Sequence, residues 1–178
     1  MSSTSNSRIV RRRLLGLLAA WPFAGLASGG PESLVAGWQR WGSGEFRRFG
    51  FLIYHATLWA AGADPQQPPL ALKLTYQRSI AGQDIAAASV KEIRNLGLAQ
   101  EADLGRWGEQ MAGLFPDVRA GDHLLGVHLA GGARFFFNDR PIGQVDDPAF
   151  ARAFFAIWLD PRTSAPDLRA ALLKRPAA

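Results

Sequence analysis

A tyrosine and two arginines are the residues of this sequence best suited to hold a ligand. Tyr54 is a polar-tipped aromatic in the most apolar segment, residues 49–60, and Arg47 and Arg48 lie upstream across an expected bend at Gly50. A buried tyrosine hydroxyl usually needs a hydrogen-bond partner. A tyrosine and an arginine that both point into an apolar cleft would bind the carboxylate of an apolar ligand. A purely structural Tyr54 is the alternative interpretation.

The other residues capable of chemistry have simpler structural interpretations. His123 and His128 are five positions apart on one expected strand, so they lie on opposite faces and cannot share a metal by themselves. Asp146 and Asp147 favour the capping of a following helix over acid–base catalysis. The sequence contains no cysteine and shows no nucleophile elbow, phosphate-binding loop or zinc-protease motif. We therefore expect no metal, no cofactor and no catalytic residue identifiable from motifs alone.

These side chains must be positioned by a domain in which strands and helices alternate in blocks. Three strands are expected first, at 34–41, 49–60 and 70–76, followed by two helices at 84–96 and 101–115. Three more strands are expected at 122–130, 133–137 and 141–145. Two helices end the chain, the first capped by Asp147 and the second by Thr163 or Ser164. Gly131-Gly132 and Asn138-Asp139 are turn dipeptides, which make the later strands antiparallel. Gly42-Ser43-Gly44 is expected to form a bend or bulge between strands. The order predicts an α+β fold, with a largely antiparallel sheet packed against helices.

The N-terminal segment has the features of an export signal. Arg8 and Arg11–Arg13 precede an apolar run that starts at Leu14, and a plausible cleavage site follows Ala27. The arginines fit either a general secretory (Sec) or a twin-arginine signal, and retention as a signal anchor is a further alternative. The chain is therefore expected to consist of a signal at residues 1–27 and one domain at 28–178, located in the periplasm or secreted.

The leader also accounts for most of the positive charge of the chain. It holds four of the 20 Lys and Arg residues and no acidic residue, so 16 basic residues remain against 15 acidic ones. A net charge of +1 removes the main support for a nucleic-acid or membrane-surface role. We expect no nucleic-acid partner and no membrane span after signal cleavage.

Several segments, taken together, resemble the chalcone isomerase superfamily in its bacterial chalcone isomerase-like branch. They are residues 50–59 (GFLIYHATLW), 74–84 (LTYQRSIAGQD), 115–118 (FPDV) with Gly121-Asp122, 136–143 (FFNDRPIG) and 150–161 (FARAFFAIWLDP). The resemblance implies an antiparallel sheet wrapped by helices, an open-faced β-sandwich with a cleft between the layers.

The resemblance also implies one of two kinds of function. Plant chalcone isomerases close a chalcone to a flavanone with an Arg, a Thr, a Tyr and an Asn, whereas related proteins bind fatty acids through an Arg and a Tyr. Here Tyr54 stands at the Thr position, Ile85 at the Tyr position and Glu92 at the Asn position, and the Arg position falls near Phe46 with Arg47 adjacent. Thr163 or Ser164 lies where the family has a hydroxyl. Because an Ile cannot donate a proton and a Glu opposes a phenolate, cyclase activity is doubtful.

Three hypotheses follow. The first is an exported, non-catalytic binder of a fatty acid or similar amphipathic, hydrophobic small molecule, with Arg47, Arg48, Tyr54, Thr163 and Ser164 as ligand-binding candidates. The second is a chalcone–flavanone isomerase-type intramolecular lyase. The third is a periplasmic structural or interaction module. An open cleft beside Tyr54 would favour the first two hypotheses, and a cleft filled by Phe and Trp would favour the third.

Overall fold

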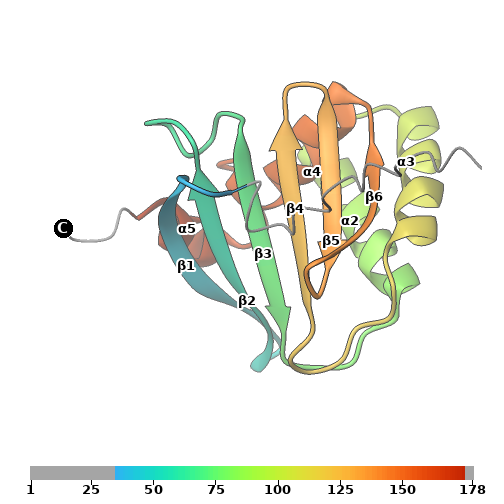
Figure 1. The fold of residues 1–178 in the computed structure, drawn as a ribbon. Helices are drawn as coiled ribbons and strands as arrows, with labels where there is room; N and C mark the ends of the chain where they lie inside the picture. Colours follow the sequence, from blue (N-terminus) through green and yellow to red (C-terminus); the bar gives the residue numbers. More distant parts are fainter. Residues whose placement is uncertain (1–34, 175–178) are drawn as a thin grey trace, which may run out of the picture.

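The structure, a computed structural model, describes residues 35–174 and contains one six-stranded antiparallel sheet in that range (Figure 1). The predicted export signal lies outside the described residues. The strands are β1 (Gln39–Arg48), β2 (Phe51–Ala60), β3 (Leu70–Tyr76), β4 (His123–Leu129), β5 (Gly132–Phe137) and β6 (Arg140–Val145). They are hydrogen-bonded in sequence order, from β1 at one edge to β6 at the other.

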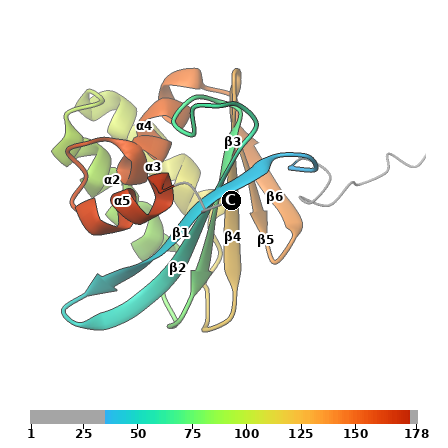
Figure 2. The ribbon, with the colours of Figure 1, turned by 90° about the vertical axis from the view of Figure 1, so that its left-hand side faces the viewer.

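Four helices within this range cover one face of the sheet (Figure 2). They are α2 (Gly82–Leu96), α3 (Glu101–Leu114), α4 (Pro148–Leu159) and α5 (Pro166–Leu173). Helix α4 packs on β4 and β5, α5 packs on β1 and β2, and α2 contacts both α3 and α4. This arrangement confirms the α+β fold class. None of the helices among the described residues is long and apolar enough to cross a membrane.

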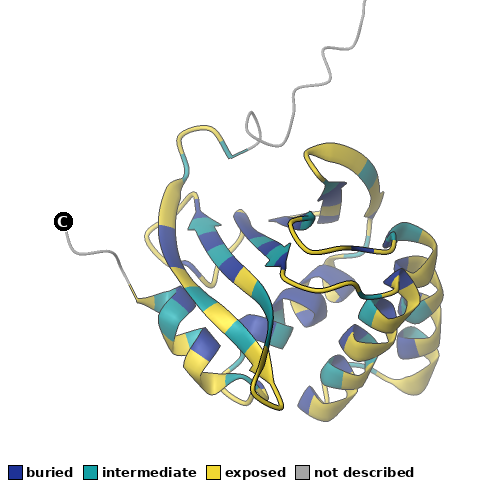
Figure 3. Cartoon of the chain, turned by 90° about the horizontal axis from the view of Figure 1, so that it is seen from below, coloured by how far each residue is buried: buried dark blue, intermediate teal, exposed yellow. Residues whose placement is uncertain are grey.

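The main core lies between the sheet and the helices because side chains alternate along each strand. On β3, Leu70, Leu72 and Leu74 face the helices, whereas Ala71 belongs to a smaller apolar cluster on the opposite face. Figure 3 shows the buried positions where strands and helices face each other. Phe135, Phe150, Phe154 and Phe155 form a network of ring contacts in this core.

Most of the local signals in the sequence are confirmed. Asn138 and Asp139 adopt positive φ in the β5–β6 turn, and Gly97 ends α2 in the left-handed conformation. Asp147 caps α4 by accepting hydrogen bonds from the backbone N–H groups of Ala149 and Phe150.

The glycine pattern near residue 43 has a different role from the one expected from the sequence. The expected strand 34–41 and the expected break between strands at 42–44 are wrong, because β1 begins at Gln39 and continues through Gly42 and Gly44 to Arg48. The alternative of a bulge is confirmed in part, because the β1–β2 register shifts between Arg40 and Gly42, inside the strand and not between two strands. A Cβ atom on Gly42 would collide with the carbonyl oxygen of Leu172, and one on Gly44 would lie 2.7 Å from the Cβ of Ala171. These glycines therefore let α5 approach the strand closely.

The expected cap of the last helix is also wrong. Helix α5 begins at Pro166, its N-cap is Ala165, and no side chain caps it. The Thr163 hydroxyl instead accepts a hydrogen bond from the Ala165 N–H, one residue before the helix. Pro166 at the first helical position needs no N–H partner, which reduces the need for a side-chain cap.

His128 is a buried titratable residue that should make stability depend on pH. Its ring stacks on Phe155 at 5.0 Å, and its Nδ1 has no hydrogen-bond partner among the described residues. Burial lowers the pKa of His128 from its ordinary value, and the positive charge of Arg152 lowers it further.

We expect the free energy of unfolding to fall by up to about 1.4 kcal/mol per pH unit below about pH 6.5, because the unfolded chain binds a proton that the folded imidazole resists. His128→Phe keeps the ring stack and should remove this part of the pH dependence. Urea denaturation of both proteins at several pH values measures how the free energy of unfolding depends on pH. Parallel stability profiles for the two proteins would contradict the assignment.

Candidate functional site

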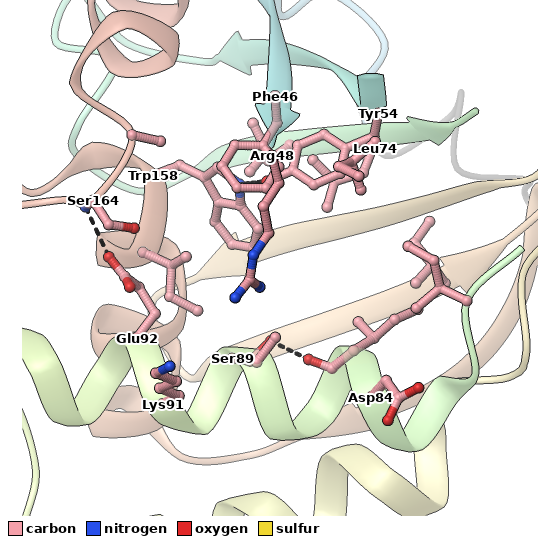
Figure 4. Close-up of a pocket in the computed structure, with 18 of the residues that line it drawn as sticks. Phe46, Arg48, Tyr54, Leu74, Asp84, Ser89, Lys91, Glu92, Trp158 and Ser164 are labelled. Atoms are coloured by element: carbon pink, nitrogen blue, oxygen red, sulfur yellow. Dashed lines mark hydrogen bonds between the residues drawn. The ribbon is translucent and has the colours of Figure 1, made fainter. Parts of the chain in front are cut away.

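A cavity of about 680 Å³ lies between the helix-facing side of the sheet and helices α2 and α4 (Figure 4). Its volume is within the range of roughly 300–1,000 Å³ that is typical of small-molecule sites. Its floor is buried and apolar, formed by Leu72, Leu74, Tyr76, Phe115, Leu124, Phe135, Phe154 and Trp158. Its rim is exposed and more polar, and includes Arg48, Asp84, Lys91, Asn95 and Ser164. The cleft beside Tyr54 is therefore open and not packed shut.

Tyr54 projects from β2 into this cavity and is held there by two neighbours. Its hydroxyl oxygen accepts a hydrogen bond from Trp158 Nε1 at 3.0 Å, and its ring stacks on Phe46 at 5.0 Å. Burial raises the pKa of Tyr54 well above its ordinary value, the Trp158 N–H bond opposes this, and the charge of Glu92 adds to it. The phenol therefore stays protonated. Because its oxygen already accepts from Trp158, its O–H is left to donate to a ligand.

Tyr76 is a second tyrosine of the cavity, which the sequence analysis did not identify as a site residue. It is directly opposite Tyr54 across the β2–β3 pair, with ring centroids 5.8 Å apart. Burial and the neighbouring Tyr54 raise its pKa, so it too is neutral. Its hydroxyl makes no hydrogen bond to another described residue. The only sequence signal was a polar tip on the apolar face of residues 70–76.

The structure distinguishes between the two adjacent arginines of β1. Arg47 donates from Nε to Glu45 Oε2 at 2.9 Å, in an exposed ion pair. Arg48 projects across the cavity (Figure 4) and forms no ion pair with a described residue. Both are among the lining residues, but only the Arg48 guanidinium is available to an anion in the cavity.

Helix α2 presents one face to the cavity because its lining residues recur at helical spacing. Ile85, Ser89 and Glu92 all lie on this face. The Ser89 hydroxyl donates to the Ile85 carbonyl at 2.9 Å, and Glu92 Oε1 accepts from the Ser164 N–H at 2.9 Å. The two positions assigned through the family resemblance, Ile85 and Glu92, thus do line the cavity.

Thr163 and Ser164 differ in what they offer a ligand. The buried Thr163 hydroxyl donates to the Ile157 carbonyl at 2.6 Å and accepts from the Ala165 N–H at 3.2 Å, so it fixes the α4–α5 loop. Ser164 is exposed at the rim, and its hydroxyl makes no hydrogen bond to a described residue. Of the five predicted residues, Arg48, Tyr54 and Ser164 bring available groups to the cavity.

Comparison with known proteins places this chain in a family. Residues 48–174 match the chalcone isomerase-like family profile. An uncharacterized protein of Haemophilus influenzae is 31% identical over 140 residues, which are 78% of this chain and 69% of the relative. The crystal structure of a fatty-acid binding protein of Arabidopsis thaliana has the same fold, with a TM-score of 0.62 at 11% identity over 78% of this chain and 87% of that one. This chain is a member of the chalcone isomerase-like family.

Proposed function

We propose that this protein is a non-catalytic binder of a fatty acid or a similar amphipathic small molecule. The observation that carries the proposal is the make-up of the cavity, which combines a buried apolar floor with two polar groups from the sheet, the guanidinium of Arg48 and the neutral hydroxyl of Tyr54. An acyl chain would bury its methylenes against the floor, and its carboxylate would accept hydrogen bonds from these donors. The Arabidopsis protein that shares the fold is, by its description, a fatty-acid binding protein.

The residues that α2 presents to the cavity argue against chalcone cyclisation. Ile85 offers no proton and cannot order a water molecule. Glu92 places a carboxylate at the cavity, where its charge would oppose a developing phenolate. The cavity is thus better suited to bind an anionic head group at Arg48 than to form a phenolate on the α2 side.

Titration calorimetry with saturated fatty acids of increasing length tests the proposal. The affinity is expected to rise roughly fourfold for each added methylene, which corresponds to about 0.8 kcal/mol per buried CH₂, until the cavity is full. Fatty acids should also raise the melting temperature, because they bind only the folded chain. If neither fatty acids nor aromatic acids bind or raise the melting temperature, the proposal is wrong.

Arg48 and Arg47 provide a matched pair of variants for the head-group site. Arg48→Gln is expected to weaken fatty-acid binding roughly 10- to 100-fold, since a hydrogen bond to a charged group contributes about 1.5–3 kcal/mol. Arg47→Gln removes the same charge one residue away but only breaks the pair with Glu45, so the affinity should stay within about twofold. A fatty-acid methyl ester, which has no carboxylate, should bind all three proteins alike. Equal losses of fatty-acid affinity in both variants would show that binding responds to the overall positive charge and not to the Arg48 guanidinium in particular.

Export remains part of this proposal. The predicted signal at residues 1–27 lies outside the described residues, and we propose that the domain acts in the periplasm or outside the cell. An intact mass showing that the protein recovered from its cells begins at Ser28 would support this location.

A further inference from the structure

The turn between β1 and β2 exposes two large apolar side chains. Phe49 is 87% exposed and Phe51 is 59% exposed, whereas most large apolar side chains in the described part of the chain are buried or half-buried. Figure 3 shows the hairpin as an exposed loop, and Figure 2 shows that it curves toward the helix side. Isolated exposed apolar residues are common on proteins, but two aromatics at one turn form a local patch.

The backbone at this turn makes the choice of phenylalanine more unusual. Phe49 has a φ of +52°, a left-handed conformation that is unfavourable for a bulky side chain and that Gly or Asn adopts more easily. Its side chain is also exposed. Neither backbone preference nor burial within the chain therefore favours Phe at position 49, so a binding role outside the folded chain is the better explanation.

A cation lies over each of the two exposed rings. The guanidinium carbon of Arg48 is 5.4 Å from the centre of the Phe49 ring, and that of Arg78 is 4.7 Å from the centre of the Phe51 ring. Neither arginine forms an ion pair with a residue in the described range 35–174. Arg48, Phe49, Phe51 and Arg78 are called the aromatic-basic tip below. The tip combines exposed aromatic surface with two uncompensated positive charges.

We propose that the aromatic-basic tip docks on an anionic lipid bilayer. Aromatic rings partition into the bilayer interface, and arginines beside them are attracted to the negative surface potential of acidic lipids. Phe46, Arg48 and Phe49 also line the cavity, so docking places the cavity rim against the membrane. The docking proposal rests on the four tip residues alone. The further step, in which an amphipathic ligand passes between the bilayer and the cavity, rests on the proposed function.

Co-sedimentation with vesicles of equal parts phosphatidylcholine and phosphatidylglycerol tests the docking. Phe51→Thr with Arg78→Gln changes two tip residues that do not line the cavity, and it should lower the partition coefficient at least tenfold, with Arg78→Gln alone contributing about fivefold. Leu98→Ser with Arg134→Gln is the matched control, because it also removes one exposed apolar side chain and one arginine, and its partitioning should equal that of the parent. Binding by the parent should weaken at high salt and on vesicles of phosphatidylcholine alone.

Phe49→Asn provides a second test with a stability readout. Asn tolerates positive φ, so the melting temperature should stay the same or rise while vesicle binding falls. A fall in both would indicate that Phe49 has a structural role.

A local probe separates docking of the tip from any contribution of residues 1–34. Because the chain has no cysteine, Ser79→Cys or Leu98→Cys gives a single site for an environment-sensitive dye in the full chain. On anionic vesicles the dye emission should shift to the blue at position 79, beside Arg78, and stay unchanged at position 98. An unchanged spectrum at position 79 would overturn the proposal.

Two further outcomes would also overturn the docking proposal. One is equal vesicle partitioning of the Phe51→Thr/Arg78→Gln variant and the parent. The other is a dimer in sedimentation velocity that this variant loses, which would make the tip an interface between two copies of the chain. The fatty-acid affinity of this variant in solution should equal that of the parent, so failure of the docking and failure of the proposed function give different results.

Discussion

Replacing Ser89 by tryptophan is expected to abolish fatty-acid binding while leaving the chain folded. Ser89 is buried on the cavity face of α2, and among the described residues its hydroxyl bonds only to the Ile85 carbonyl one turn earlier in the same helix. An indole at this position has the cavity as its available space and would fill the volume that the acyl chain needs. We expect the affinity to fall by at least about 100-fold, the loss of four or more buried methylenes at about 0.8 kcal/mol each, with little change in melting temperature.

Ala87→Trp is the matched control for this experiment. Ala87 is exposed on the same helix, two residues earlier, and does not line the cavity. Calorimetry should give parent-like affinity for Ala87→Trp and no detectable heat for Ser89→Trp, and thermal melting should show both variants folded. Parent-like binding by a folded Ser89→Trp protein would mean that the ligand binds elsewhere.

Replacing Gly82 by alanine is expected to cause a large loss of stability, although it adds only one methyl group. Gly82 is the first residue of α2 and is pressed against the segment after α3. A Cβ atom here would collide with the carbonyl oxygen of Phe115 and lie 2.8 Å from its carbonyl carbon, and both are backbone atoms that no rotamer change can move. The Gly82 N–H also donates to Asp117 Oδ1 at 2.9 Å, so a shift of α2 would break this bond. We expect a loss of about 3 kcal/mol or more.

Gly105→Ala separates this clash from a general effect of glycine replacement. Gly105 lies within α3, and a Cβ atom there would have no neighbour within 4 Å. Alanine should therefore stabilise the helix by roughly 0.5–1 kcal/mol. In thermal unfolding, Gly82→Ala should melt roughly 10 °C below the parent and Gly105→Ala slightly above it. A parent-like melting temperature for Gly82→Ala would mean that α2 can move away from Phe115 at little cost, and the position of the cavity would then be less fixed than the contacts indicate.

The elements of the fold were predictable where the signal lies within a few neighbouring residues. Alternation along residues 70–76 gave β3 with its correct bounds, and Asn138-Asp139 gave the β5–β6 turn. The glycines at 42 and 44 were misassigned for the opposite reason. A glycine that makes a bend and one that admits another element look the same in a sequence, and only the packing of α5 on β1 distinguishes them.

The type of chemistry at the candidate site was predictable from the sequence, but the identity of the residues that form the site was less so. Tyr54 was identified as a hydroxyl in an apolar strand, but its partner Trp158 is 104 positions away, and no local pattern connects them. Arg47 and Arg48 could not be told apart, since the distinction depends on the ion pair with Glu45 and on which side of β1 faces α2. Tyr76 was overlooked because its part in the cavity follows from its cross-strand register with Tyr54.

The sequence by itself determined most of the helices and strands, the α+β class and the resemblance to the chalcone isomerase-like family, because helix and strand periodicities and turn dipeptides act over short distances. Tertiary structure decided the rest. It opened a cavity beneath α2, left the Arg48 guanidinium without an acidic partner in the described range, and gathered two arginines and two phenylalanines at one turn. A net charge of +1 for residues 28–178 carries no information about such a patch, since folding redistributes charges in space without changing their sum.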